Sequence, residues 1–346
     1  MQMNAQTASA SRSTISDDWR RWIAENLMLG SQSASLLDIL VKQGITATEA
    51  KDEIDAAINA IRSPYFQALQ RVNNRLAKRD WVLAIQTKLT QLAPVDIPRH
   101  HQLSRADFLQ QYYSRNLPVI ITGMLDTCPA YTKWSLDYFQ QHFSERMVEV
   151  QFGRNTDQNY ELNSIAHKRQ IAFGEFVELV RSSGSTNDFY MTANNDSKNR
   201  EVLSELWNDV PTLSEYLRTD GAKQGFFWLG PAGTVTPFHH DLTNNFMAQI
   251  IGRKRVRLFA PYHSANVYNH RHCFTPVDGR AIDLKAYPTM AGVPVLDCIL
   301  EPGEILFLPV GWWHFVEALD ISVTVSNTNF IWDNDFYSNY PQHHDF

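Results

Sequence analysis

The sequence predicts a mainly β protein with appended helices, in which a helical N-terminal region precedes a β-rich domain. Apolar residues recur at helical spacing from about residue 16 to residue 92. From about residue 225 onward, short β-forming runs alternate with turns such as Gly230-Pro231 and Pro302-Gly303, which is typical of an antiparallel sandwich or barrel. A chain of 346 residues with 44% apolar content is long enough for two such units.

Composition restricts the partners and the compartment. The net charge of −6 argues against charge-driven binding of nucleic acid, so we expect no nucleic-acid partner. The three cysteines, Cys128, Cys273 and Cys298, have no paired spacing, which suits a reducing compartment. No apolar run is long enough for a signal peptide or a bilayer span. We therefore predict a cytoplasmic protein without a membrane partner, and a disordered N-terminus over residues 1–15.

Capping signals define the helical region, which we place at residues 16–92. Thr46 and Glu49 have the spacing of a capping box, and Pro64 follows Ser63 at the start of a long last helix. We predict a helical bundle that packs on the main domain or on a second copy; the alternative is a groove for a substrate. Because so small a bundle covers only part of its apolar surface, we predict a homodimer with this region in its interface. A linker around residues 92–95 then leads to the main domain, residues 96–346.

The stretch "TPFHHDLTNNF" carries a candidate metal site. On a strand, residues two apart share a face, so His239 and Asp241 point one way and His240 points the other. His314, which ends a second β-forming run, is the best candidate for a third ligand. Two imidazoles and one carboxylate with open positions form the facial triad of non-haem Fe(II) oxygenases. The tripeptide alone is a weak signal, since a buried histidine satisfied by a neighbouring carboxylate is commoner.

A lysine on a later strand strengthens this interpretation. In "GRKRVRLFAP", Lys254 shares a face with Val256 and Leu258, and the arginines occupy the other face. A lysine among inward apolar residues is costly unless it pairs with an anion, which a dicarboxylate cosubstrate would supply. In the alternative, Lys254 points outward and three arginines are buried together.

Three motifs occur in order: "FFWLGPAGTVTPFHHD", "NNFMAQIIGRKRVRLFAP" and "PGEILFLPVGWWHFVEAL". With them, the chain from roughly residue 100 to residue 330 resembles the JmjC or cupin-like Fe(II)/2-oxoglutarate-dependent oxygenases. Within that family it resembles most the asparaginyl-hydroxylase (factor-inhibiting) branch. The resemblance implies a double-stranded β-helix (jelly-roll or cupin) core, with His239, Asp241 and His314 as the iron ligands.

The resemblance also implies the cosubstrate contacts and the reaction. Lys254 should bind the distal carboxylate of 2-oxoglutarate, Thr236 and Tyr190 should hydrogen-bond to it, and Asn245 and Asn327 should lie near the iron-bound end. The implied cofactors are Fe(II), 2-oxoglutarate and O2. The implied reaction hydroxylates a C–H bond of a peptide or protein side chain and releases succinate and CO2. The alternatives are a small-molecule hydroxylase, an N-demethylase, and a non-catalytic metal-bound cupin that senses a ligand.

Overall fold

The computed structural model describes residues 15–28, 30–92, 96–193, 198–210, 212–220, 225–269 and 272–340. Contacts within the chain divide it into two compact units, Met1–Ala84 and Ile85–Phe346. Apart from Ile15, the expected disordered N-terminus lies outside the described residues, and so do residues 93–95 of the expected linker. Within the described ranges, no helix combines the length and the apolar character that crossing a bilayer requires.

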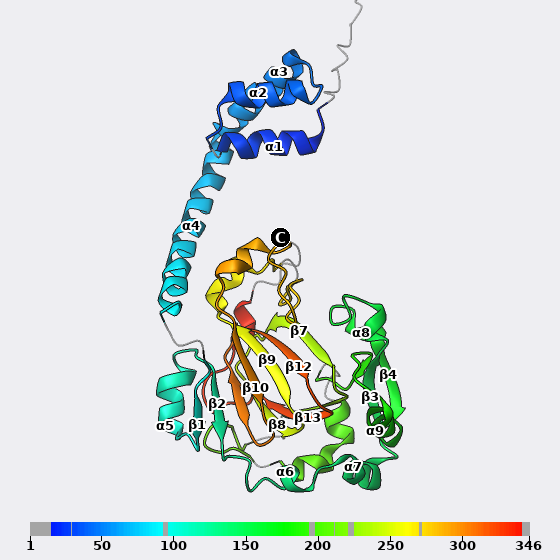
Figure 1. Ribbon diagram of the computed structural model, residues 1–346. Coiled ribbons are helices and arrows are strands. Elements are labelled where there is room, and N and C mark those ends of the chain that lie inside the picture. The colour runs from blue at the N-terminus through cyan, green and yellow to red at the C-terminus, as the bar shows by residue number, and fades with distance from the viewer. Residues whose placement is uncertain are drawn as a thin grey trace, which may run out of the picture. The chain divides into compact units, whose positions relative to one another are not determined.

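Four helices follow one another near the N-terminus (Figure 1): α1 (Asp17–Met28), α2 (Ser33–Lys42), α3 (Ala47–Ile61) and α4 (Pro64–Thr90). The predicted capping signals act as expected. Thr46 Oγ1 accepts a hydrogen bond from the Glu49 amide at 3.2 Å, and Ser63 Oγ accepts one from the Phe66 amide at 3.2 Å. Helices α1 to α3 share a small core of Ile23, Leu36, Leu40, Ala50 and Ile54. The described side chains of α4 include none that is buried.

The described residues of the second unit include ten strands that form two sheets. They are β1 (Arg99–His101), β2 (Val119–Thr122), β6 (Gly225–Gly230), β7 (Val235–His240), β8 (Asn245–Ile251), β9 (Lys254–Phe259), β10 (Leu296–Leu300), β11 (Ile305–Leu308), β12 (Trp313–Ala318) and β13 (Ser322–Asn327). One sheet has the order β1-β2-β11-β8-β13-β6 and the other β10-β9-β12-β7. Every pairing except that of β1 with β2 is antiparallel. The two sheets lie face to face (Figure 1), which is the predicted jelly-roll core.

The strands alternate between the inside of this sandwich and its outer faces. On β11, Leu306 and Leu308 enter the apolar cluster between the sheets, whereas Phe307 faces a larger cluster on the outside. The inner cluster takes Val256 and Leu258 from β9.

Further elements cover the outer faces. The helices are α5 (Arg105–Asp107), α6 (Pro129–Lys133), α7 (Leu136–Phe143), α8 (Ser164–His167), α9 (Phe173–Ser182) and α10 (Lys198–Val202), and a third sheet is made of β3 (Met147–Phe152), β4 (Lys168–Ala172) and β5 (Phe189–Tyr190). Phenylalanines of α7 and α9 pack on the outer face of the six-stranded sheet. A bridge between Met191 and Leu229 joins the end of β5 to β6, and this brings Tyr190 to the sandwich.

Candidate metal centre and cosubstrate cavity

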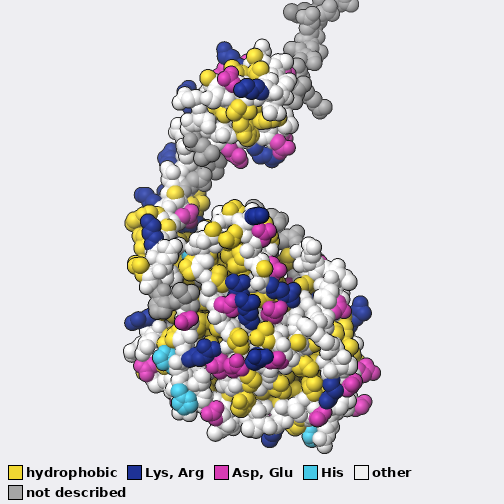
Figure 2. Space-filling view, in the orientation of Figure 1, with side chains coloured by type: hydrophobic (Ala, Val, Ile, Leu, Met, Phe, Trp, Pro, Cys, Tyr) yellow, Lys and Arg dark blue, Asp and Glu magenta, His cyan; other side chains and the backbone are white. Residues whose placement is uncertain are grey.

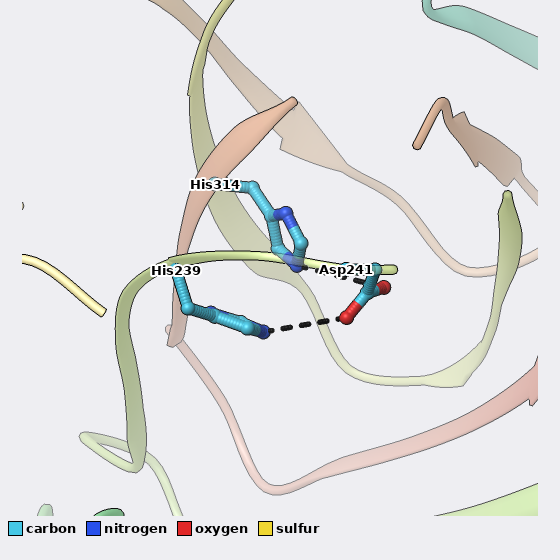
Figure 3. A group of neighbouring side chains, drawn as sticks. All are labelled: His239, Asp241 and His314. Atoms are coloured by element: carbon cyan, nitrogen blue, oxygen red, sulfur yellow. Dashed lines mark ion pairs between the residues drawn. The ribbon is translucent and has the colours of Figure 1, made fainter. Parts of the chain in front are cut away.

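Three side chains that could hold a metal ion meet at the end of β7: His239, Asp241 and His314 (Figure 3). Their ligand atoms all lie within 4.8 Å of one another, and no other such group occurs among the described residues. His239 Nε2 lies 3.8 Å from Asp241 Oδ1, and His314 Nε2 lies 4.0 Å from Asp241 Oδ2. The two histidines are direct partners across the β7–β12 ladder, with ring centroids 4.1 Å apart. Strand pairing thus brings together residues that are far apart in the sequence.

Backbone carbonyls fix the orientation of both imidazoles. Nδ1 of His239 lies 2.8 Å from the carbonyl oxygen of Pro237, and Nδ1 of His314 lies 3.0 Å from that of Trp312. A carbonyl oxygen only accepts, so Nδ1 carries the proton in each ring. Both Nε2 lone pairs are left toward Asp241 (Figure 3), which is how a metal-binding histidine is usually held.

The charge states of the group suit a divalent metal. Burial lowers the pKa of His239 well below its usual value, and the neighbouring His314 lowers it further. Burial acts to raise the pKa of Asp241, but His314, His239 and a hydrogen bond from Asn245 outweigh it, so the pKa is lowered. Metal ligands must be deprotonated, and a neutral imidazole beside an ionised carboxylate meets that condition. The residues present therefore fit a metal ion.

His240 takes no part in this group. Its ring lies edge-on to Trp313 at 4.8 Å and to Tyr340 at 5.6 Å, on the outer face of the four-stranded sheet. This is the orientation predicted from strand parity.

A cavity opens beside the three candidate ligands, inside the sandwich. Besides them it is lined by Tyr190, Trp228, Thr236, Asn245, Met247, Lys254, Leu308, Val316, Thr324 and Ser326. Four of the five residues expected to contact the cosubstrate are therefore in this lining: Lys254, Thr236, Tyr190 and Asn245.

Lys254 is the one lysine or arginine in the lining, and its side chain is 2% exposed. Its Nζ donates a hydrogen bond to the Tyr190 hydroxyl at 3.1 Å, and no carboxylate of the described residues pairs with it. Burial lowers the pKa of Lys254 to about 7. On the opposite face of the strand, Arg255 pairs with Asp297. The lysine points inward, as the alternation predicted, and the alternative with buried arginines is wrong.

Of the two predicted asparagines, only Asn245 reaches the cavity. Its Nδ2 donates to Asp241 Oδ2 at 3.1 Å and so helps to orient that carboxylate. Asn327 is not brought to the cavity. On β13, Thr324 and Ser326 face inward, and Asn327 falls on the outer side, where its Nδ2 would lie 3.1 Å from a Cβ added at Gly225. Asn327 directly follows the inward-facing Ser326, and a step of one residue turns a side chain to the other face of a strand.

Two residues near the cavity were missed from the sequence. Trp228 lines the wall and donates from Nε1 to Ser326 Oγ at 2.8 Å. Strand alternation is the signal that could have found it. Its neighbours on β6, Phe227 and Leu229, point to the outer face, so Trp228 points inward.

Arg154 is the second missed residue, and it is 1% exposed. Its Nη2 donates to Glu161 Oε1 and to the Val235 carbonyl, both at 2.7 Å. The guanidinium also lies over the rings of Tyr160 at 4.3 Å and Tyr190 at 5.2 Å. Arg154 therefore supports both Tyr190 and the strand that carries Thr236. A buried arginine leaves no signal in a sequence, because most arginines are exposed.

A jelly-roll sandwich with two histidines and one aspartate at its inner face defines a class, that of the non-haem Fe(II) oxygenases of the cupin type. The comparisons agree with that class. The family model of the cupin-like domain matches residues 105–338 of this chain. The chain therefore belongs to the cupin-like, JmjC-type family of Fe(II)/2-oxoglutarate-dependent oxygenases, as the resemblance predicted. The asparaginyl-hydroxylase branch is not singled out by these matches.

Three relatives show the range of the family. The chain is 33% identical to "Lysine-specific demethylase JMJ30" of Arabidopsis thaliana over 69% of its length, and to "Lysine-specific demethylase 8" of Xenopus tropicalis it is 32% identical over 66%. It spans about half of these two proteins, 55% and 52%. It is also 26% identical, over 67% of its length, to "tRNA wybutosine-synthesizing protein 5" of Gallus gallus, of which the match covers 76%.

Proposed function

We propose that this chain is an Fe(II)- and 2-oxoglutarate-dependent oxygenase that hydroxylates a C–H bond of a peptide or protein side chain. The observation that carries the proposal is Lys254, a buried cation without a carboxylate partner among the described residues, in the same cavity as the three candidate metal ligands. A cosubstrate with a chelating end and a distal carboxylate satisfies both needs.

His239, Asp241 and His314 would hold the iron through their two Nε2 atoms and a carboxylate oxygen. Bound iron, 2-oxoglutarate and O2 together supply the oxidation, in which the cosubstrate becomes succinate and CO2 and one oxygen atom enters the substrate. The chain itself fixes the ligand geometry. The carbonyls of Pro237 and Trp312 hold the two imidazoles, and Asn245 holds the carboxylate.

The far end of the cavity would bind the distal carboxylate. Lys254 supplies the charge, and the hydroxyls of Tyr190 and Thr236 supply hydrogen bonds beside it. Val316, which pairs with Thr236 across the sheet, gives this end an apolar wall, and this strengthens the ionic contact. Because the cosubstrate would raise the pKa of Lys254 from about 7, the protonated form is favoured once the carboxylate is bound.

A second candidate is N-demethylation of a methylated lysine. Two relatives, at 33% and 32% identity, are named lysine-specific demethylases, and this favours the second candidate. The chemistry at the metal is the same, because hydroxylation of an N-methyl carbon gives a product that loses formaldehyde. The remaining alternatives are a small-molecule substrate and a metal-bound cupin that senses a ligand without turnover.

The test supplies Fe(II), 2-oxoglutarate, ascorbate and a library of peptides, some with methylated lysines. Succinate formation that depends on a peptide supports the oxygenase, and a mass gain of one oxygen atom in that peptide identifies a hydroxylase. Formaldehyde release with loss of a methyl group identifies a demethylase. Binding of 2-oxoglutarate without succinate in any mixture would favour the sensor, and absence of binding would refute the proposal as a whole.

A further inference from the structure

We propose that helix α4 pairs with α4 of a second copy of this chain as a parallel, two-stranded coiled coil. The sequence predicted a homodimer with residues 16–92 at its interface; this inference assigns the contact to one face of one helix and gives its register. It concerns the first unit and is independent of the oxygenase reaction.

The observation behind it is a long helix without cover. Every side chain described between residues 67 and 82 is exposed. The large apolar ones are Val72 at 51%, Leu76 at 41%, Trp81 at 67% and Val82 at 50%, and Tyr65, just before this stretch, is 85% exposed. The core of the first unit comes from α1 to α3 and includes none of these residues. A helix that makes no tertiary contact is only marginally stable in water, so this stretch needs a partner.

Three of the exposed apolar residues, together with the half-buried Leu83, form a stripe with heptad spacing, whereas Trp81 at position f lies on the opposite face and Val82 and Leu89 take position g. Leu76 and Leu83 take position a, and Tyr65 and Val72 take position d. Asn74 lies on the opposite face of the helix. Figure 2 shows hydrophobic and basic side chains side by side along this helix. Hydrophobic residues at a and d are the seam that draws two helices together.

The charges beside the stripe favour a second copy in parallel orientation. Arg75 takes position g, and Asp80, five residues later, takes position e. In a parallel pair each g residue faces the e residue of the next heptad on the other chain, so Arg75 meets Asp80 of the second copy, twice in each dimer. In an antiparallel pair g residues face g residues, and Arg75 would find no carboxylate there, because the other g positions hold Ala68, Val82 and Leu89. Arg79 falls at a d position, where a polar residue weakens the pairing, and we expect a dimer of moderate affinity.

Cysteine cross-linking tests the register on the full chain. In a parallel pair a d residue lies opposite its own copy, so Val72→Cys should form a disulfide-linked dimer under mild oxidation. Asn74→Cys, on the opposite face, is the matched control and should stay at the background set by the wild-type protein. Equal cross-linking of both variants, or none with Val72→Cys, would overturn the proposal.

Light scattering and sedimentation over a series of concentrations test the affinity. The wild-type chain should reach twice its monomer mass of 39.7 kDa. Val72→Lys should weaken the dimer by about a hundredfold, since two valines leave the interface, and Asn74→Lys should leave it unchanged. Lysine is a good helix former, so circular dichroism should show no loss of helix in either variant.

Charge reversal tests the pairing of g with e. Arg75→Asp and Asp80→Arg should each weaken the dimer several-fold. The double variant should restore it, because both charges are then reversed and the attraction between them is kept. A monomer at every concentration would mean that another surface, of the second unit or of an acidic partner protein, covers the stripe, and would refute the inference. A dimer that Val72→Lys leaves intact would refute it equally, since the interface would then lie elsewhere.

Discussion

Replacing Lys254 by methionine removes the charge from the cavity and keeps the length of the side chain. Lys254 is 2% exposed, and its ammonium donates to the Tyr190 hydroxyl at 3.1 Å without a carboxylate partner among the described residues. Burial lowers its pKa from 10.5 to about 7. In the protein without metal and cosubstrate, burial of this unpaired ammonium group therefore lowers the free energy of unfolding. The Lys254→Met variant buries no charge at this position and is free of that cost.

The size of this cost follows from the two pKa values. They differ by about 3.5, and each unit corresponds to about 1.4 kcal/mol, so the cost near pH 7 is about 4 kcal/mol. Loss of the hydrogen bond to Tyr190 offsets about 1 kcal/mol of the gain. We therefore expect Lys254→Met to raise the free energy of unfolding by about 2–3 kcal/mol at pH 7.

The pH dependence has a definite sign. The folded pKa lies below the unfolded one, so the destabilisation is fully present below pH 7 and disappears as the pH rises toward 10.5. Calorimetry or urea unfolding of the chelator-treated protein at two pH values measures it. The advantage of Lys254→Met should shrink as the pH rises from 7 to 10. Lys285→Met, at an exposed lysine, is the control and should change stability by less than about 0.5 kcal/mol.

The same variant should lose the cosubstrate. With a divalent metal present, 2-oxoglutarate should raise the melting temperature of the wild-type protein and leave that of Lys254→Met unchanged. A variant that is less stable than the wild type at pH 7, with no dependence on pH, would show that Lys254 already has a partner in the folded chain. That result would remove the main support for a dicarboxylate site.

Three further predictions concern neighbouring residues. His239→Ala should abolish stoichiometric iron binding and His240→Ala should retain it, because only the imidazole of His239 faces the other candidate ligands. Metal analysis of the purified variants tests this, and loss of iron only with His240→Ala would reverse the assignment. Arg154→Met should lower the free energy of unfolding by about 3 kcal/mol, because Glu161 is left without its cation. In urea unfolding, the double variant with Glu161→Gln should recover part of the lost stability. An unchanged midpoint for Arg154→Met would contradict the ion pair between Arg154 and Glu161. Thr236→Val should raise the KM for 2-oxoglutarate several-fold at constant kcat, and a fall in kcat alone would place the hydroxyl elsewhere.

The parts of the site that could be predicted from the sequence are those that strand alternation determines. His239, Asp241 and Lys254 follow from a period of two, and the inward face of Lys254 is marked by apolar residues beside it. Asn327 shows the limit of that argument. Its strand has a register shift between Val323 and Thr324. After that shift, Thr324 and Ser326 form a polar face that is visible in the sequence, and Asn327 lies on the opposite face of the strand. Attention to that alternation alone would have placed Ser326 in the cavity.

The contributions of the third sheet could not be predicted in this way. Tyr190 lies on a two-residue strand, too short for a period, and reaches the cavity only because β5 bridges to β6. Its place came from the resemblance to a family and not from the pattern of residues. Arg154 is held by Glu161 and by a backbone carbonyl of β7, two contacts that depend on how separate sheets meet. Tertiary contacts of this kind leave no periodic signal in a single sequence.

Comparison of the two buried cations separates a structural role from a ligand-binding one. Among the described residues, Arg154 and Lys254 are the lysine or arginine side chains that are buried, at 1% and 2% exposure. Arg154 has a carboxylate of its own chain, Glu161, at 2.7 Å, and its charge is therefore balanced whether or not a ligand is present. Within the described part of the chain, Lys254 has the Tyr190 hydroxyl and no carboxylate. An unpaired buried charge destabilises a fold, so its presence beside three metal-ligand side chains is best explained by an anion that arrives from outside the chain.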